Sequence, residues 1–256
     1  MTFELRRENC SATFKVAGEV TFMKWILPNA CTAANLFFGM CSILATYEGD
    51  YFNASVFILL ALIADGMDGR VARALNAASE LGKEMDSLCD LGSFGVAPAF
   101  LAYAFCMHNF GLLGKAAAII FALCGMWRLA RFNVNTSVVH GFFMGLAIPA
   151  GGCIIATTTL LFLALDVHPE NFGLVYPITV IIVAYLMVSH VHYPDFKGGG
   201  EKLFLVAKIF AAALFAGIIY IARDVPVQGV LTAIFATYAV FGIVNSMITL
   251  MTRDKL

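Results

Sequence analysis

Charged residues are scarce in this sequence, and their scarcity excludes several classes of protein. They make up 13% of the 256 residues, whereas hydrophobic residues make up 61% and mean hydropathy is +0.85. A soluble domain carries about 25% charged residues, because its surface faces water. The chain therefore has too few polar residues for a water-facing globule or a disordered protein, and most of it is expected to face lipid.

An excess of basic residues is also missing. The net charge is −1, with 16 Lys and Arg residues against 17 Asp and Glu residues. Without a positive field the chain does not attract phosphate polymers, so nucleic acid is not expected as a partner. The 7 cysteines show no C-x-x-C spacing. This argues against a zinc site or a disulfide scaffold and favours small buried hydrophobic residues.

Long apolar runs dominate what remains. Eight segments are long and apolar enough to span a bilayer as helices, and none alternates polar and apolar residues as a membrane strand would. The segments are 30–48, 52–76, 87–108, 111–133, 142–166, 172–190, 203–222 and 227–250. The sequence therefore predicts an all-α fold, a polytopic membrane helix bundle of about eight transmembrane helices.

The two ends of the chain lie outside this bundle. Residues 1–24 mix acidic and basic side chains and lack the apolar core of a cleavable signal peptide. We expect 1–26 to form a cytosolic or interfacial arm, 27–250 a single transmembrane catalytic domain, and 251–256 a cytosolic tail.

The basic residues predict the orientation of the bundle. With both termini in the cytosol, thirteen of the 16 Lys and Arg residues fall on the cytosolic side, as the positive-inside rule requires. Lys208 lies near the cytosolic end of its segment, and only Lys115 and Arg223 fall outside. The thirteen are Arg6, Arg7, Lys15, Lys24, Arg70, Arg73, Lys83, Arg128, Arg131, Lys197, Lys202, Arg253 and Lys255.

Acidic residues gather where the second segment ends and the third begins. Asp65 and Asp68 are spaced i,i+3, and Asp86 and Asp90 are spaced i,i+4, so each pair shares one helix face. Four converging carboxylates repel one another unless cations neutralise them. Oxygen ligands alone suit Mg²⁺ or Mn²⁺, and four carboxylates suit two such ions, an arrangement common in phosphoryl chemistry.

Glycines and arginines near the aspartates favour a phosphate ligand. Gly66, Gly69 and Gly82 let a ligand approach the helix backbone, and Arg70 and Arg73 can bind phosphate oxygens. These residues complete the pattern D-x-x-D-G-x-x-A-R-x8-G-x3-D-x3-D, which resembles the signature of the CDP-alcohol phosphotransferases. The matching positions are Asp65, Asp68, Gly69, Ala72, Arg73, Gly82, Asp86 and Asp90.

This resemblance implies a membrane enzyme that transfers a group from a CDP-linked lipid to an alcohol and releases CMP. Members of the family have a six-helix core and are usually homodimers. By resemblance, Asp65, Asp68 and Asp86 are metal ligands, and Asp90 completes the second metal site and serves as the base on the acceptor hydroxyl. Gly69, Ala72, Arg73 and Gly82 are expected to line the cytidine diphosphate.

Three further segments resemble the membrane-integral phosphatidylserine synthases: 27–35, 128–133 and 189–197. Relatives often carry Pro at the position of Ala147. The resemblance implies CDP-diacylglycerol and L-serine as substrates, at a site on the cytosolic face of the cell membrane. It assigns Asn29, Thr32 and Asn35 to the nucleotide side, and the serine carboxylate needs a cation. The candidate cations are Arg128, Arg131 and Lys197.

Two alternatives stay open. Another CDP-alcohol phosphotransferase would use glycerol 3-phosphate or inositol phosphate, which are dianionic and call for a denser basic cluster than the serine carboxylate does. An ion transporter could also use aspartates within the membrane. Its acidic residues are expected near mid-membrane, whereas these aspartates lie at the cytosolic ends of the predicted spans.

Overall fold

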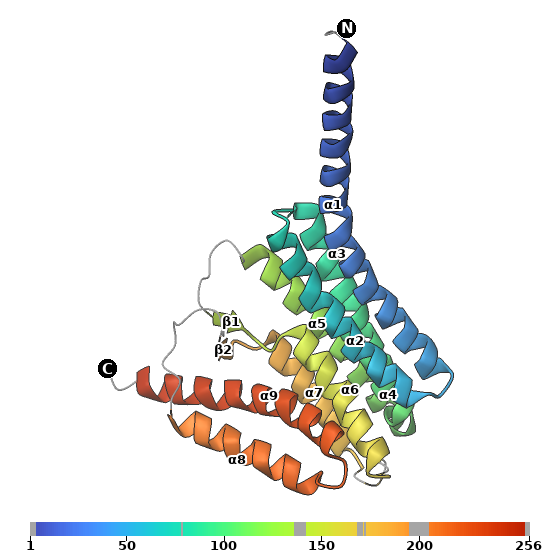
Figure 1. Cartoon of the computed structure of the whole chain (residues 1–256). Helices are drawn as coiled ribbons and strands as arrows, with labels where there is room; N and C mark the ends of the chain where they lie inside the picture. The colour runs from blue at the N-terminus through green and yellow to red at the C-terminus, as the bar shows by residue number, and fades with distance from the viewer. Residues whose placement is uncertain are drawn as a thin grey trace.

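Helices dominate the computed structural model of the chain (Figure 1). The structure describes residues 4–77, 79–135, 142–167, 171, 173–194 and 205–253. The larger elements are α1 (Glu4–Tyr47), α2 (Tyr51–Ala74), α3 (Glu80–Asp90), α4 (Ala97–Phe105), α5 (Gly111–Asn135), α6 (Ile148–Ala164), α7 (Val175–Val188), α8 (Leu205–Ile221) and α9 (Pro226–Arg253). Two short helical pieces join them: the π-helix Leu91–Val96 and the 3₁₀-helix Met107–Phe110.

Each predicted apolar segment corresponds to helical structure. Four helical stretches are long and apolar enough to cross a membrane, and three shorter apolar helices accompany them among the described residues. The four are Ile26–Tyr47, Glu80–Phe105, Met107–Val134 and Pro226–Met247. The prediction of a membrane helix bundle is confirmed at this level, while the count of eight spans and the side on which the termini lie stay predictions.

Helix α1 runs through the predicted boundary at residues 26 and 27 without a break, although it contains Pro28. Figure 1 shows its N-terminal half projecting away from the other helices. Its C-terminal half packs against α2, α3 and α4. The arm that the sequence predicts is therefore continuous with the first apolar helix.

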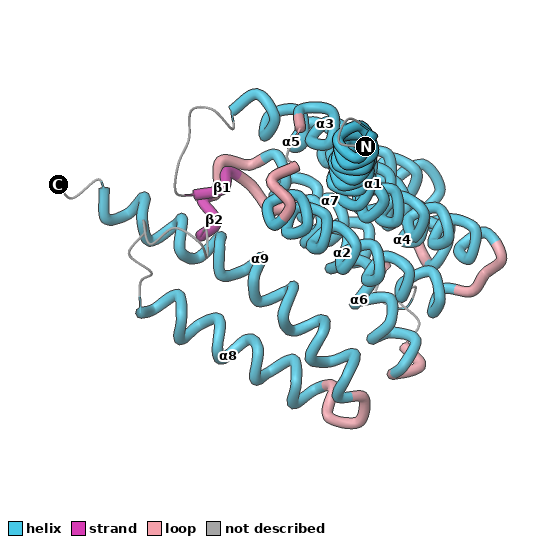
Figure 2. The backbone as a smooth tube through the Cα atoms, turned by 45° about the horizontal axis from the view of Figure 1, so that its top comes forward, coloured by secondary structure: helices cyan, strands magenta, loops and turns pink. Residues whose placement is uncertain are grey.

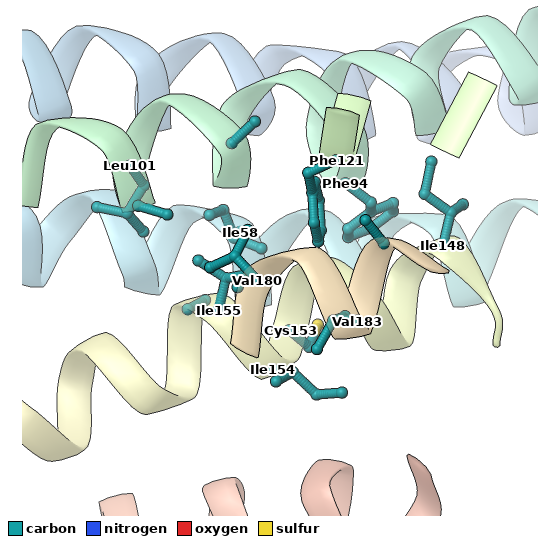
Figure 3. Packing of buried hydrophobic residues seen from close by; sticks show 14 of the residues in the cluster. Ile58, Phe94, Leu101, Phe121, Ile148, Cys153, Ile154, Ile155, Val180 and Val183 are labelled. Atoms are coloured by element: carbon teal, nitrogen blue, oxygen red, sulfur yellow. The ribbon is translucent and has the colours of Figure 1, made fainter. Parts of the chain in front are cut away.

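The core lies between α2, α4, α5, α6 and α7, where large apolar side chains are fully buried. Figure 3 shows Ile58, Phe94, Phe121 and Ile148 meeting from different elements. A second set of large apolar side chains, which includes Leu112, lies on the outside of the bundle. These side chains are exposed, as expected of a surface that faces lipid. Figure 2 shows α8 and α9 side by side at one edge of the bundle, with α9 also packed on α6.

Cysteines behave as the composition suggests. The six in the part of the chain with described side chains are free. Cys89, Cys106 and Cys153 are buried, and the other three are partly buried. Three of these six therefore have the burial that the prediction of small apolar residues expects.

One local feature departs from an all-helical fold. Strands β1 (Phe142–Met144) and β2 (His192–Pro194) pair antiparallel between the loop before α6 and the loop after α7. Gly145 extends this junction: its N–H donates to the Val191 carbonyl at 2.8 Å, with a φ of +80° that favours glycine. Ala147 follows with φ −62° and ψ 136°, a conformation that proline also adopts. The alanine therefore has a backbone shape that a proline at this position would also allow.

Candidate active site

Three of the predicted metal ligands come together where α2 faces α3. Oxygens of Asp65, Asp68 and Asp86 all lie within 4.8 Å of one another. Asp68 is buried, and the other two are partly buried. The two helix faces that the spacing predicts therefore do meet.

Asp90 lies at the edge of this group in a separate environment. It is 7% exposed and is the last residue of α3, immediately before the π-helix. Its Oδ1 accepts a hydrogen bond of 3.0 Å from Asn35 Nδ2, and its carboxyl is close enough to Asp65 for the two to interact. Asp90 thus interacts with the other aspartates and has, in addition, a hydrogen-bond partner on α1.

The donor set of the cluster fits divalent metal ions. It consists of carboxylate oxygens, which hard cations such as Mg²⁺ prefer. Asp86 Oδ1 is buried without a hydrogen-bond partner, so a coordinating cation would satisfy it. Two guanidinium groups interact with the cluster, Arg73 with Asp68 and Arg128 with Asp65 and Asp90. These two guanidinium groups carry two positive charges, whereas four ionised carboxylates carry four negative ones. Because the carboxylates are largely buried, further positive charge is needed to stabilise them.

A cavity of about 290 Å³ opens beside the carboxylates, bounded by α1, α2 and α3. Its lining contains six of the seven residues that the resemblance assigns to the nucleotide, all except Asn35. The six are Asn29, Thr32, Gly69, Ala72, Arg73 and Gly82. Asp68 and Asp86 form part of the same wall, so the nucleotide residues and the carboxylates share one cavity.

Thr32 connects the cavity wall to the cluster. Its hydroxyl lies 2.9 Å from Asp68 Oδ2 and 3.2 Å from the Pro28 carbonyl oxygen, four residues earlier on α1. The single proton of the hydroxyl can be donated to only one of these acceptors at a time. When it is donated to Asp68, it orients a carboxylate that also faces Asp86.

Gly82 of α3 faces Asn29 of α1 across the cavity wall. A Cβ atom at this position would stand 3.1 Å from Ser79 Oγ and 3.5 Å from Asn29 Oδ1. Ser79 caps α3, since its Oγ accepts a 3.0 Å hydrogen bond from the Gly82 N–H. A side chain at this position would therefore crowd the capping Ser79 hydroxyl and narrow the cavity.

Arg128 of α5 lies on another side of the cluster. It is 8% exposed, and its guanidinium carbon stands 5.4 Å from the centre of the Phe132 ring. Asp65, Asp90 and Tyr238 are all within electrostatic range of it. A buried cation beside the carboxylates is what the prediction of an acceptor-binding arginine requires.

The structure gives Arg131 partners other than the predicted serine carboxylate. Its Nη1 donates to the Val188 carbonyl at 2.9 Å. Its Nη2 is 2.9 Å from the Met144 carbonyl oxygen, 3.1 Å from that of Ser189 and 3.4 Å from that of Met187. Arg131 therefore joins the loop before α6 to the end of α7 through its Nη1 and Nη2 atoms, and its predicted contact with the serine carboxylate stays a prediction.

The remaining candidate cation, Lys197, lies outside the described residues. Two residues that the sequence did not assign, Ser79 and Lys83, line the nucleotide cavity. Asn35, which the resemblance assigned to the nucleotide side, is not among the cavity-lining residues and binds Asp90. Lys83 precedes Asp86 by three residues and so shares its helix face, a spacing that could have revealed it. Asn35 lies one turn beyond Thr32, so the spacing predicts that both share one face of α1. The spacing does not predict which helix that face contacts.

Comparisons with known proteins agree with this geometry. The family profile described as CDP-alcohol phosphatidyltransferase matches residues 25–191. A Helicobacter pylori (strain ATCC 700392 / 26695) protein named CDP-diacylglycerol–serine O-phosphatidyltransferase is 34% identical over 227 residues, which is 86% of this chain and 91% of that protein.

Proteins of the same name from two other organisms also match. The Methanocaldococcus jannaschii protein is 35% identical over 214 residues, 84% of this chain and 90% of its own length. The Bacillus subtilis (strain 168) protein is 34% identical over 172 residues, 67% of this chain and 91% of its own length. The matched regions contain the carboxylate cluster and its cavity, and the chain belongs to the CDP-alcohol phosphatidyltransferase family.

Proposed function

We propose that the chain transfers the phosphatidyl group of CDP-diacylglycerol to the hydroxyl of L-serine, giving phosphatidylserine and CMP. The observation that carries the proposal is the shared cavity, whose wall holds six nucleotide-assigned residues together with Asp68 and Asp86. The serine specificity is supported by the three relatives described above, each of which bears the name CDP-diacylglycerol–serine O-phosphatidyltransferase.

Asp65, Asp68, Asp86 and Asp90 would hold two divalent cations, Mg²⁺ or Mn²⁺. Bound there, the ions would neutralise charge on the diphosphate and on the attacking and leaving oxygens. The support is the mutual approach of three carboxylates within 4.8 Å and the unpartnered Asp86 Oδ1.

The chain's own residues bind the diphosphate and take the proton from the acceptor. Arg73 and Lys83 lie in the cavity wall, where they can bind the diphosphate, and Gly69 and Gly82 leave room for it. Asp90 takes the proton from the serine hydroxyl as the serine oxygen bonds to the β-phosphorus, the one that carries diacylglycerol. The bond from that phosphorus to the bridging oxygen breaks, and CMP leaves with the electron pair.

Arg128 is the residue we assign to the serine carboxylate, because it is the buried cation beside Asp90. Lys197 stays a second candidate from the sequence. A dianionic acceptor such as glycerol 3-phosphate or inositol phosphate fits the charge of this part of the site less well than serine does. Among the described residues, Arg128 is the cation that approaches Asp65 and Asp90, and a second negative charge would lack a partner there.

The placement in the membrane follows from the sequence. We propose eight spans within a catalytic domain of residues 27–250, with both termini and the active site on the cytosolic side of the cell membrane. The four long apolar helices support a membrane location. Pairing of two copies into a homodimer is proposed from the family resemblance.

The reaction itself tests the function. Protein purified in detergent is expected to release CMP from CDP-diacylglycerol when L-serine and Mg²⁺ or Mn²⁺ are present, and to stop when the metal is chelated. Glycerol 3-phosphate and inositol phosphate, each supplied in place of serine, are expected to give only background release. Release with one of those acceptors but not with serine would overturn the serine assignment, and no metal-dependent release with any acceptor would overturn the reaction class.

Arg128 and Arg131 should differ in their effect on serine. Arg128→Ala is expected to raise the KM for serine by about 10-fold or more, because it removes a charge-assisted bond to the carboxylate, while the KM for CDP-diacylglycerol changes little. Arg131→Lys serves as the control: it should lower the melting temperature and leave the KM for serine within a few-fold of normal. Steady-state kinetics with either substrate varied separates the two, and the reverse pattern would assign serine to Arg131.

Asp90→Asn should lower turnover by about 10²-fold or more, the usual loss when a positioned base is removed. Asparagine keeps the size and one oxygen, so the affinity for CDP-diacylglycerol should stay close to that of the wild type. Equilibrium binding of the donor lipid, measured beside kcat, is the comparison that matters. Equal losses of binding and turnover would make Asp90 chiefly a metal ligand.

A further inference from the structure

Asn35 is a buried polar residue of α1 that the nucleotide cavity does not use. It is 0% exposed and lies three residues beyond Thr32, deeper in the bundle. Its Nδ2 donates a 3.0 Å hydrogen bond to Asp90 Oδ1, so one of the two oxygens of that carboxylate is occupied. The proposed base thus has a fixed partner from a different helix.

The same residue is tied to the chain just after Asp90. Ser93 Oγ donates a 2.9 Å hydrogen bond to the Asn35 carbonyl oxygen. Asp90 and Ser93 are three residues apart and both contact Asn35, so the junction of α3 with the π-helix is held to α1 at a single residue. Gly39, one turn further along α1, makes the approach possible, since any Cβ there would collide with Ser93.

Stability alone does not explain an asparagine here. Its Oδ1 is buried and has no hydrogen-bond partner, so half of the amide is unsatisfied. A buried polar atom in that state lowers stability, and an apolar side chain of similar size, such as leucine, would avoid the loss. The contact that distinguishes asparagine from leucine is the hydrogen bond to Asp90.

We propose that Asn35 is a positioning residue for catalysis. It binds Oδ1 of Asp90 and so fixes the plane of the carboxylate that receives the proton of the acceptor hydroxyl. This inference rests on the proposed function, because it assumes that Asp90 is the base. Asn35 itself touches neither the nucleotide cavity nor the three aspartates that lie within 4.8 Å of one another.

The test compares Asn35→Leu and Asn35→Asp with the wild-type enzyme. Both variants lack the N–H donor, so each should lower kcat with serine by about 10- to 100-fold, the effect of one charge-assisted hydrogen bond. The KM for CDP-diacylglycerol should stay within about twofold, because the cavity wall is intact. The melting temperature of Asn35→Leu should equal or exceed that of the wild type, an outcome that a purely structural role would not give.

Thr46→Val is the matched control. Thr46 is a buried polar residue of the same helix, and its hydroxyl donates to the Ser42 carbonyl at 2.7 Å, away from the aspartates. Its loss should leave kcat unchanged. The proposal is overturned if Asn35→Asp keeps wild-type kcat, or if Asn35→Leu loses stability while the folded protein keeps kcat. If Asn35→Leu does not fold, Asn35→Asp alone decides. A wild-type protein that releases no CMP with serine would instead refute the proposed function.

Discussion

Mutual repulsion among buried carboxylates is the constraint on which the rest of the site depends. Asp68 and Asp90 are each 7% exposed, and Asp65 and Asp86 lie between them. Negative charges at this density are unstable in a low-dielectric interior unless cations compensate them. The cluster is therefore best understood as incomplete without a divalent metal, and the lipid diphosphate would be drawn to the metal rather than to the protein alone.

The helices around the cluster act as a rigid frame for it. Helix α1 contributes Thr32 to Asp68 and Asn35 to Asp90, so one helix orients a carboxylate from each of the two aspartate pairs. Arg131 of α5 joins the loop before α6 to the end of α7 through backbone carbonyls. Arg128 lies one turn earlier on α5, so the same helix carries both the tether and the buried cation beside the carboxylates.

Patterns along single helices could be predicted from the sequence, and contacts between helices could not. The spacing of Asp65 with Asp68 and of Asp86 with Asp90 fixes which side chains share a face, and the helices formed where the apolar segments indicated. Arg131 shows the limit. Its spacing from Arg128 suggested a shared ligand, but the carbonyls it binds belong to a junction that forms only when α5 and α7 pack together. The three-residue strands of that junction are too short to leave a sequence pattern.

Direct measurement of metal binding tests the central claim. Electron paramagnetic resonance of purified protein titrated with Mn²⁺ should show two ions per chain, magnetically coupled because carboxylates within 4.8 Å of one another would hold them close together. Asp86→Asn should lose at least one ion and the coupling. Wild-type protein that binds no more Mn²⁺ than Asp86→Asn would contradict the account.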